Sequence, residues 1–454
     1  MHQGTFVRRF QTPVGRLVRP AGFAMLLALG LGSVPAQAAE APSAGIAGGV
    51  GAMAITQFYD ERGGAPIWLA GGQIEPGRRL IELLARSDLD GLDPRRFNVR
   101  QLGKALEAAE DGNPRDVARA DRMLSEAFIR YVADLSQIRP GTEWKFVDPE
   151  AKPRPVDARV LLQQAAATGS IDRFLETMPW MHESYSGLRR AYEQATLQGD
   201  SSAASRLRLN LERVRHLPAG PERFVLVNTA AQRLYMYENG RVVDWMRVVV
   251  GKAEQPTPMM AALIRFTALN PYWNVPDDLV AERIAPNVVK QGLGYLRSQR
   301  YVVLSDWSEN PEQIDPSTID WKAVEAGQVR VRVRQNPGPA NAMGQMKFMF
   351  PNNEGVYLHD TPNKELLAGE VRMHSAGCVR LEDAPRLARW LYGRPLEPKG
   401  ATPEQKVSLD QPVPVYLAYL TAVPSGTETV FYDDIYGRDR ARLAEAAVAP
   451  ITVR

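Results

Sequence analysis

Apolar side chains in the first half of the chain recur at helical spacing. Between positions 57 and 198 they repeat every three or four residues, which is the period of helices with one buried face. Two of these stripes stop at turn-forming pairs, Asp90-Gly91 and Pro140-Gly141. A last short helix is expected over 206–215. The pattern predicts a helical domain over residues 56–218.

The spacing changes after this domain, where short runs rich in Val, Leu, Tyr and Met are typical of consecutive strands. The pair Asn239-Gly240 between two of them indicates a tight hairpin. Helices are expected only over 278–289 and 383–392, the second with Asp383 as its N-cap. A mostly β domain over 219–437 therefore follows the helical one, and the fold class is α+β. Strands are expected over residues 224–228, 233–237, 242–250, 262–269, 301–304, 329–334, 347–350, 356–359 and 413–422.

The first 38 residues have the pattern of a secretory signal peptide. They combine four arginines, no acidic residue and an apolar run over 21–34 that leads to Ala36-Gln37-Ala38. Cleavage is expected after Ala38. The alternative is an uncleaved membrane anchor, but the run is shorter than the roughly 20 apolar residues that span a bilayer. The mature chain is expected to lie outside the cytoplasm without stable membrane insertion.

Composition changes this picture little. Residues 39–55 are rich in Ala and Gly and are expected to form a flexible linker, and the Ala-rich segment 438–454 a C-terminal tail or helix. The chain carries 55 Lys and Arg against 52 Asp and Glu, and the leader arginines account for this excess. No basic field therefore points to a nucleic-acid partner. A single cysteine excludes an internal disulfide and a cysteine-based zinc site.

The strongest chemical signal surrounds that cysteine, Cys378. Two of the four histidines that follow the leader, His359 and His374, lie 19 and 4 positions before it. A thiol with an ordinary pKa of about 8.5 is mostly protonated at neutral pH, and a neighbouring imidazole can take its proton to create the nucleophilic thiolate. Gly377 allows a sharp backbone turn that brings an N–H group close to a substrate carbonyl, as in an oxyanion hole. These residues predict acyl transfer by a Cys/His pair.

Each neighbouring residue also has a structural alternative. His374 could be a surface histidine, and His359, which ends an apolar strand, could be a hydrogen-bonded core histidine. Arg380 is more often a solvated cation than a carboxylate clamp, although its apolar neighbours on both sides suggest that it points differently from them. Ser375 could be only a turn residue.

The segment His-Ser-Ala-Gly-Cys-Val-Arg-Leu at 374–381, with Val-Tyr-Leu-His-Asp-Thr-Pro at 356–362 before it, closely resembles the active-site signature of bacterial L,D-transpeptidases. The resemblance extends to the large periplasmic subgroup of that family and covers most of residues 55–440. Further similar segments lie at 250–252, 257–258, 270–276, 334–338, 346–352 and 433–437, and, in the helical domain, at 59–68 and 209–213.

The resemblance implies a helical scaffold, a sandwich-like catalytic domain with a lid inserted over about 277–344, and an enzyme that remodels peptidoglycan in the periplasm. Cys378 would attack the amide between the L-centre of meso-diaminopimelate and the terminal D-Ala of a tetrapeptide stem, and an amine on a second stem would resolve the thioester. His359 would be the general base, with its ring oriented by a backbone carbonyl such as that of Asp360. The N–H groups of Gly377 and Cys378 would hold the oxyanion.

The remaining site residues follow from the same resemblance. Ser375 joins the catalytic loop, and Arg380 would shape the pocket and could face a stem carboxylate. The other residues implied to contact the substrate are Tyr357, Trp273, His374 and Asp360.

Two departures from the family pattern bear on substrate choice. Ala376 precedes Gly377, where many members have a histidine, so a contact made by that histidine does not transfer to His374. The subgroup also commonly inserts a peptidoglycan-binding module between its two domains, and the stretch between Tyr192 and Arg206 is too short to hold one.

Several outcomes stay open at this point. The expected partners are tetrapeptide stems as donors and a stem amine as acceptor, which would give 3→3 links between diaminopimelate residues or 1→3 links from an L-Ala amine. Water or a free D-amino acid as acceptor would make the protein an L,D-carboxypeptidase or an exchange enzyme, and a noncatalytic wall-binding scaffold is a further alternative. No cofactor or metal is expected. Carbapenems are expected to acylate Cys378, and the oligomeric state is left open.

Overall fold

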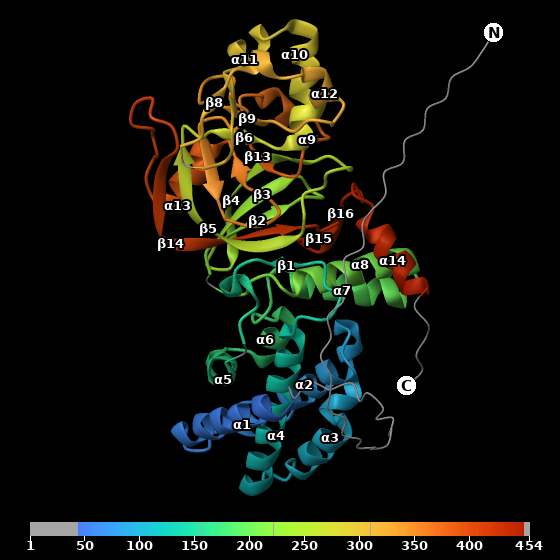
Figure 1. The fold of residues 1–454 in the computed structure, drawn as a ribbon. Helices are drawn as coiled ribbons and strands as arrows, with labels where there is room; N and C mark the ends of the chain where they lie inside the picture. Colours follow the sequence, from blue (N-terminus) through green and yellow to red (C-terminus); the bar gives the residue numbers. More distant parts are fainter. Residues whose placement is uncertain (1–43, 156, 221, 309, 449–454) are drawn as a thin grey trace, which may run out of the picture. The chain divides into compact units, whose positions relative to one another are not determined.

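The computed structural model describes residues 44–448 except 156, 221 and 309, so the expected leader lies outside the described residues. Helices form the first part, as the apolar spacing predicts (Figure 1). Several begin at polar caps, such as Asn113, Ser170 and Asp200, whose side chains accept from backbone N–H groups of the first turn. The helices are α1 (Ala44–Glu61), α2 (Glu75–Ala85), α3 (Val99–Ala108), α4 (Pro114–Ser136), α5 (Ala158–Ala167), α6 (Ile171–Thr177), α7 (Ser184–Leu197) and α8 (Ser201–Val214).

Helix α1 corrects the expected flexible linker over 39–55, because the helix already begins at Ala44. Glycines alternate here with alanines, which are the best helix formers and offset part of the cost of glycine. The following turn buries Ile55, Phe58 and Tyr59, which are spaced so as to share one helix face. Packing of that face, rather than local composition, stabilises the helix.

The strand-rich part is built on one sheet. In the described part of the chain ten strands run in the order β1-β5-β10-β11-β13-β4-β3-β2-β14, with β12 beside β4. Strand β14 pairs with both β2 and β5, so the expected sandwich-like arrangement is a single sheet that closes on itself. The strands are β1 (Lys145–Phe146), β2 (Phe224–Asn228), β3 (Arg233–Glu238), β4 (Arg241–Gly251), β5 (Met260–Leu269), β10 (Met346–Met349), β11 (Leu358–His359), β12 (Met373–Ser375), β13 (Val379–Leu381) and β14 (Gln405–Ala418).

Local signals in this sheet are confirmed. Asn239 and Gly240 join β3 to β4 with φ angles of 53° and 71°, which a two-residue hairpin turn requires. Asp383 caps helix α13 (Ala384–Tyr392) by accepting from the Arg386 backbone N–H group. The inner residues of the strands and the apolar face of α13 share one hydrophobic core, which is separate from the core that includes the scaffold helices.

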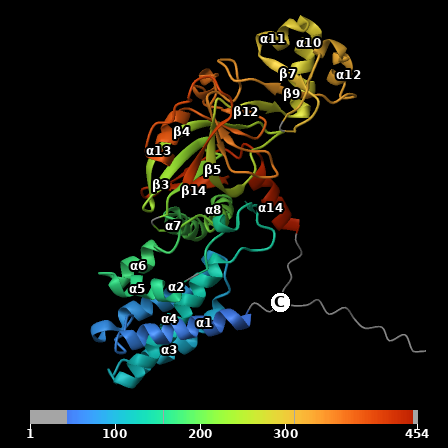
Figure 2. The ribbon, with the colours of Figure 1, turned by 60° about the vertical axis from the view of Figure 1, so that its left-hand side comes forward.

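The segment expected to form a lid is a small subdomain with its own apolar core around Val280, Ile284 and Val333. Figure 2 shows its helices α10, α11 and α12 grouped beside β7 and β9. A π-helical turn over Val280–Ile284 joins the short helix α9 to α10. Its elements are β6 (Trp273–Val275), α9 (Asp277–Leu279), α10 (Ala285–Gln291), α11 (Gly294–Ser298), β7 (Tyr301–Leu304), β8 (Gln313–Ile314), α12 (Trp321–Glu325) and β9 (Arg332–Gln335).

The C-terminal segment is not a loose tail over its first residues. After the hairpin β15 (Ala422–Ser425) and β16 (Glu428–Phe431), helix α14 spans Arg438–Val448. Asp439 in its first turn is buried and ion-paired with Arg213 of α8. This buried pair ties the start of α14 to α8, and it joins residues 226 positions apart.

Candidate active site

Side chains alternate along the adjacent parallel strands β11 and β13. Leu358 and Val379, which pair across the two strands, are fully buried in the core. Because successive side chains of a strand point to opposite faces, the neighbouring Tyr357, Cys378 and Arg380 lie on the outer face and are half-buried. The prediction that Arg380 points away from its apolar neighbours is therefore confirmed.

His359 lies on this outer face, two positions after Tyr357. It pairs with Lys347 of β10 on one side and with Arg380 of β13 on the other, and its side chain is only 1% exposed. Its Nδ1 atom lies 2.6 Å from the carbonyl oxygen of Asp360. A carbonyl can only accept, so Nδ1 carries the proton and the Nε2 lone pair is available as a base. The expected orientation of this ring is confirmed.

Burial lowers the pKa of His359 to about 3, and the cations Arg380 and Lys347 add to this shift. The Asp360 carbonyl acts in the opposite direction but does not outweigh burial. At neutral pH the resting imidazole is therefore uncharged, as a base that must accept a proton has to be.

The thiol of Cys378 lies on the same outer face, two positions before Arg380. Burial raises the pKa of Cys378, and hydrogen bonding to Tyr357 together with the charge of Arg380 opposes part of the rise. Its Sγ atom lies 3.6 Å from the carbonyl oxygen of Gly355, and no hydrogen bond joins it to the His359 ring within the described residues. At neutral pH the pair therefore rests as a neutral thiol just before β13 and a neutral imidazole at the end of β11.

The loop before Cys378 corrects the expected oxyanion hole. Gly377 has a φ of +105°, which favours glycine, but its N–H group donates to Ser375 Oγ at 3.2 Å. Ser375 Oγ in turn donates to the Cys378 carbonyl at 2.5 Å. The Gly377 N–H group is thus used by the fold, whereas the Cys378 N–H group donates to no protein acceptor among residues 44–448. Of the two expected donors, only the Cys378 N–H group is thus left without a protein acceptor among these residues.

Thr257 supports this loop and was not identified from the sequence as a site residue. Its hydroxyl donates to the Gly377 carbonyl at 2.8 Å and accepts from the Gly251 N–H group at 3.0 Å. A Cβ atom at Gly251 would lie 2.2 Å from the Gln255 carbonyl oxygen, so only glycine permits this close approach. The one available signal was a glycine at the end of a strand pattern, followed by a threonine.

Asp360, which the resemblance implied to contact the substrate, has a structural role in the fold. Its carboxylate accepts from the Gln345 N–H group at 2.9 Å and from Lys364 Nζ at 2.8 Å. A Cβ atom at Gly344 would lie 2.3 Å from its Oδ2 atom, so the hairpin closes tightly over it. These contacts hold the backbone carbonyl that orients His359.

The outer face is rich in positive charge. The charges of Lys347 and Arg380 act on His359, and the charge of the lid residue Arg283 acts on Arg380. The Nε atom of Arg380 is buried without a hydrogen-bond partner in the described chain. Burial and the nearby Arg283 lower the pKa of Arg380. Lys347 has a partial counter-charge in Glu404, 3.5 Å from its Nζ atom. Lys347 is a second residue that was missed as a site residue, and its signal was a lysine inside an apolar strand.

Two other expected site residues lie elsewhere. His374 is exposed on β12, on the side opposite to buried Ser375, because adjacent strand residues alternate. It is therefore not brought to the thiol. Trp273 belongs to β6 and packs on the lid core, with its ring centroid 6.4 Å from that of Tyr301.

The lid contacts the catalytic loop directly. Ala376 packs against the lid's apolar core, and Gln255 Nε2 donates to Asp278 at 2.8 Å. The position at which the chain departs from the family pattern therefore contacts the lid.

Neither a metal centre nor a membrane span is indicated. Among the described residues no group of three or more His, Cys, Asp and Glu side chains could hold a metal ion. In the same part of the chain no helix is both long and apolar enough to cross a bilayer.

Comparison with known proteins gives two family matches in the chain. Residues 53–191 match the model of a Scaffold domain, and residues 222–415 match that of an L,D-transpeptidase catalytic domain. A Haemophilus influenzae protein named "Putative L,D-transpeptidase" is 32% identical over 248 residues, which is 53% of this chain and 49% of the relative. The chain thus spans about half the length of the curated relative that it matches.

Solved structures give a weaker likeness. An L,D-transpeptidase from Mycobacterium smegmatis is 16% identical over 43% of this chain and 58% of its own, with a TM-score of 0.21. An Enterococcus faecium L,D-transpeptidase mutant is 14% identical over 44% of this chain and 51% of its own, with a TM-score of 0.20. Assignment of the two domains rests on the family models, which agree with the expected order of scaffold and catalytic parts.

Proposed function

Since the chain carries an L,D-transpeptidase catalytic domain behind a scaffold domain, we propose that it cross-links peptidoglycan stem peptides through a thioester on Cys378. The observation that carries this proposal is the shared outer face of β11 and β13. On it the uncharged, carbonyl-oriented His359, the thiol of Cys378 and the partner-free Arg380 lie side by side.

In the first half-reaction the Cys378 sulfur attacks the carbonyl carbon at the L-centre of meso-diaminopimelate in a donor tetrapeptide. His359 Nε2 takes the thiol proton and then gives it to the departing amine of D-Ala, so that the amide bond breaks as the thioester forms. A neutral imidazole with its other nitrogen held by Asp360 suits this transfer. The tetrahedral oxyanion would accept from the Cys378 N–H group, a contact worth about 3 kcal/mol in comparable sites.

In the second half-reaction an amine of another stem attacks the thioester carbonyl. His359 accepts the amine proton and returns it to the leaving sulfur, which restores the thiol and completes the cross-link. Arg380 supports this proposal as a binding group, since its buried Nε atom has no hydrogen-bond partner among the described residues and a substrate carboxylate would supply one. Stem peptides carry several carboxylates.

The test is incubation of the purified chain with disaccharide tetrapeptide, followed by mass spectrometric sequencing of the products. We expect dimers with loss of one D-Ala, and the fragments distinguish 3→3 from 1→3 links. The Cys378→Ala variant should lose at least about 10³-fold in rate. Tripeptide without dimers would instead mean an L,D-carboxypeptidase, and no turnover by folded protein would contradict both activities.

We also propose that the chain is exported to the periplasm and cleaved after Ala38, as its first residues suggest. N-terminal sequencing of protein recovered from a periplasmic fraction should begin at Ala39. An intact leader on cell-associated protein would point to the membrane-anchor alternative. Carbapenem treatment is expected to add one acyl group at Cys378, which intact-mass measurement would detect.

A further inference from the structure

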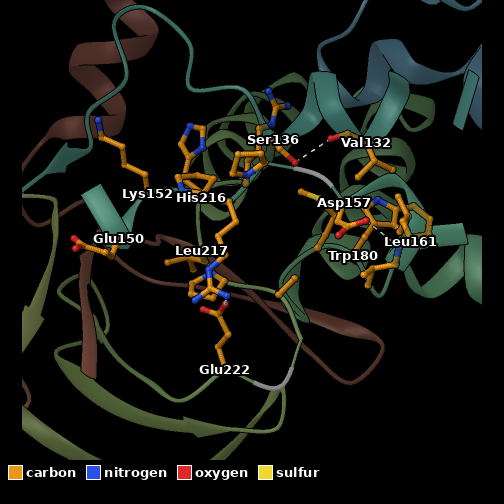
Figure 3. Close-up of a pocket in the computed structure, with 18 of the residues that line it drawn as sticks. Val132, Ser136, Glu150, Lys152, Asp157, Leu161, Trp180, His216, Leu217 and Glu222 are labelled. Carbon is orange, nitrogen blue, oxygen red and sulfur yellow. Dashed lines mark hydrogen bonds and ion pairs between the residues drawn. The ribbon is translucent and has the colours of Figure 1, made fainter. Parts of the chain in front are cut away.

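A cavity of about 270 Å³ lies away from the strands that carry Cys378, between the end of α4, the start of α5 and strand β14. Figure 3 shows Trp180 and Leu161 on one side of it and His216 and Leu217 on the other. Leu161, Leu217 and Tyr416 are buried and give it apolar walls, whereas charged side chains surround its rim. An apolar interior with a few polar groups is the usual make-up of a small-molecule site.

Three polar side chains of this cavity are left with unused nitrogens. Trp180 Nε1, Arg215 Nε and His216 Nδ1 are buried and have no hydrogen-bond partner among the described residues. Arg215 and His216 are each only 3% exposed. Burying such groups unpaired costs roughly 1–3 kcal/mol each, so a bound molecule with hydrogen-bond acceptors would recover that loss.

Charges at the cavity are already balanced, which argues against an anion. Arg215 Nη1 lies 3.2 Å from Glu212, and Arg154 Nη1 lies 3.0 Å from Glu222. Burial lowers the pKa of His216 to about 4, with the neighbouring Arg215 adding to the shift, so its ring is uncharged near neutral pH. The site suits a neutral molecule with both an apolar face and a carbonyl acceptor.

We propose that this cavity binds one N-acetylated amino sugar of a glycan strand, with the acetamide carbonyl accepting from the Trp180 N–H group. The sugar ring and the acetamide methyl would pack on Leu161 and Leu217. The volume is near the lower end of the roughly 300–1,000 Å³ usual for ligand pockets, which suits one sugar ring. The choice of sugar rests on the proposed function, since the stems of peptidoglycan hang from such a sugar.

The test uses the full chain labelled with ¹⁵N-tryptophan and titrated with N,N′-diacetylchitobiose. The indole resonance of Trp180, identified by its loss in Trp180→Phe, should shift on binding. The Trp180→Phe variant should bind the sugar at least about five-fold more weakly, the equivalent of one hydrogen bond. Trp390→Phe is the matched control, because its Nε1 is also buried and unpartnered but lies outside this cavity.

Cellobiose separates this proposal from general sugar affinity, because it lacks the acetamide groups and should leave the Trp180 resonance unmoved. Absence of a shift with diacetylchitobiose would mean that the cavity holds ordered water only and would overturn the proposal, as would equal binding by both sugars or by Trp180→Phe. The outcome is separable from that of the proposed function. Sugar-free tetrapeptide should be turned over equally by the wild type and Trp180→Phe, whereas only the wild type should show a lower KM with disaccharide tetrapeptide.

Discussion

Two arginines, buried Arg213 between the scaffold and the sheet and half-buried Arg380 on the face that carries Cys378, are treated in opposite ways by the fold. Arg213 is 2% exposed, and its Nε and Nη1 atoms lie 2.8 Å and 2.5 Å from Glu143 and Asp439. Burial acts to lower the pKa of Arg213, but the two carboxylates outweigh it and the pKa is raised. For Arg380 no carboxylate of the described residues opposes burial, and its pKa is lowered.

We interpret the difference as one between a structural cation and a cation available for binding. A buried charge is costly unless it is paired, so a protein gains stability by pairing it internally. Arg213 of α8 is paired in this way with Glu143, in the loop after α4, and with Asp439 of α14, so that it joins three segments. Arg380 keeps its buried Nε atom without a hydrogen-bond partner among the described residues, and we interpret that cost as held for a substrate carboxylate.

The largest expected effect comes from breaking the structural pair. Replacing Arg213→Met removes the guanidinium that pairs with buried Asp439 and half-buried Glu143, and removal of one partner from a buried pair typically costs about 3–5 kcal/mol. Urea unfolding monitored by circular dichroism should show this loss of stability. Arg442→Gln, which removes an exposed pair with Glu445, is the control and should change stability by less than about 1 kcal/mol. If the two variants lost the same amount of stability, the contrast between the buried and the exposed ion pair would be contradicted.

The next largest effect is expected when the pH is lowered, which should reduce the stability of both the helical part and the strand-rich part. Burial lowers the pKa values of His182 and His216 to about 4 and that of His359 to about 3, against 6.5 for an exposed histidine. Between these values the unfolded chain binds protons that the folded chain does not. Their stabilising contribution is therefore complete above about pH 6.5 and is lost as the pH falls, by at most about 1.4 kcal/mol per pH unit for each histidine.

Unfolding curves between pH 7 and pH 4 measure this slope. His359→Gln should reduce it, and His374→Gln, on an exposed side chain, should leave it unchanged. If His359→Gln left the slope unchanged, His359 would not be buried as described.

Removal of the binding cation should affect catalysis rather than stability. Arg380→Gln is expected to raise KM for disaccharide tetrapeptide about tenfold, the value of one charge-assisted hydrogen bond, with kcat little changed. The stability should stay equal or rise, because an unpaired buried charge is gone. Steady-state kinetics and thermal unfolding test the two halves, and an unchanged KM would assign Arg380 to the fold.

The smallest expected effect is at His374. It is exposed on β12 and faces away from the loop of Ser375, so His374→Ala should leave kcat, KM and stability nearly unchanged. A surface substitution of this kind usually changes stability by less than about 0.5 kcal/mol. A large loss of kcat would mean that the histidine reaches the thiol after all.

Much of the fold followed from local patterns. The hairpin at Asn239-Gly240 and the cap at Asp383 depend on conformations that a few neighbouring residues set by themselves, and both are confirmed. The alternation around Val379 likewise placed Arg380 opposite to its apolar neighbours. The linker expected over 39–55 was wrong from Ala44 onward, because helix α1 is stabilised by the partners of its buried face.

The site was partly readable for the same reason. Cysteine and histidine are the residue types that the chemistry needs, and their positions in the chain could be seen directly. Which N–H groups and carboxylates are already used could not be seen, because Ser375 Oγ captures the Gly377 N–H group and Lys364 captures Asp360 only in the folded loop.

The sequence by itself determined the order of a helical and a strand-rich part, the candidates for the thiol and its base, and the turns between strands, because these depend on side-chain type and on short-range backbone geometry. Only the tertiary structure decided that His374 is excluded from the site, that Thr257 and Lys347 support it, and that Arg213 is neutralised while Arg380 is not. Hydrogen bonds and charges are short-range in space, and residues far apart in the chain become neighbours only when the sheet closes.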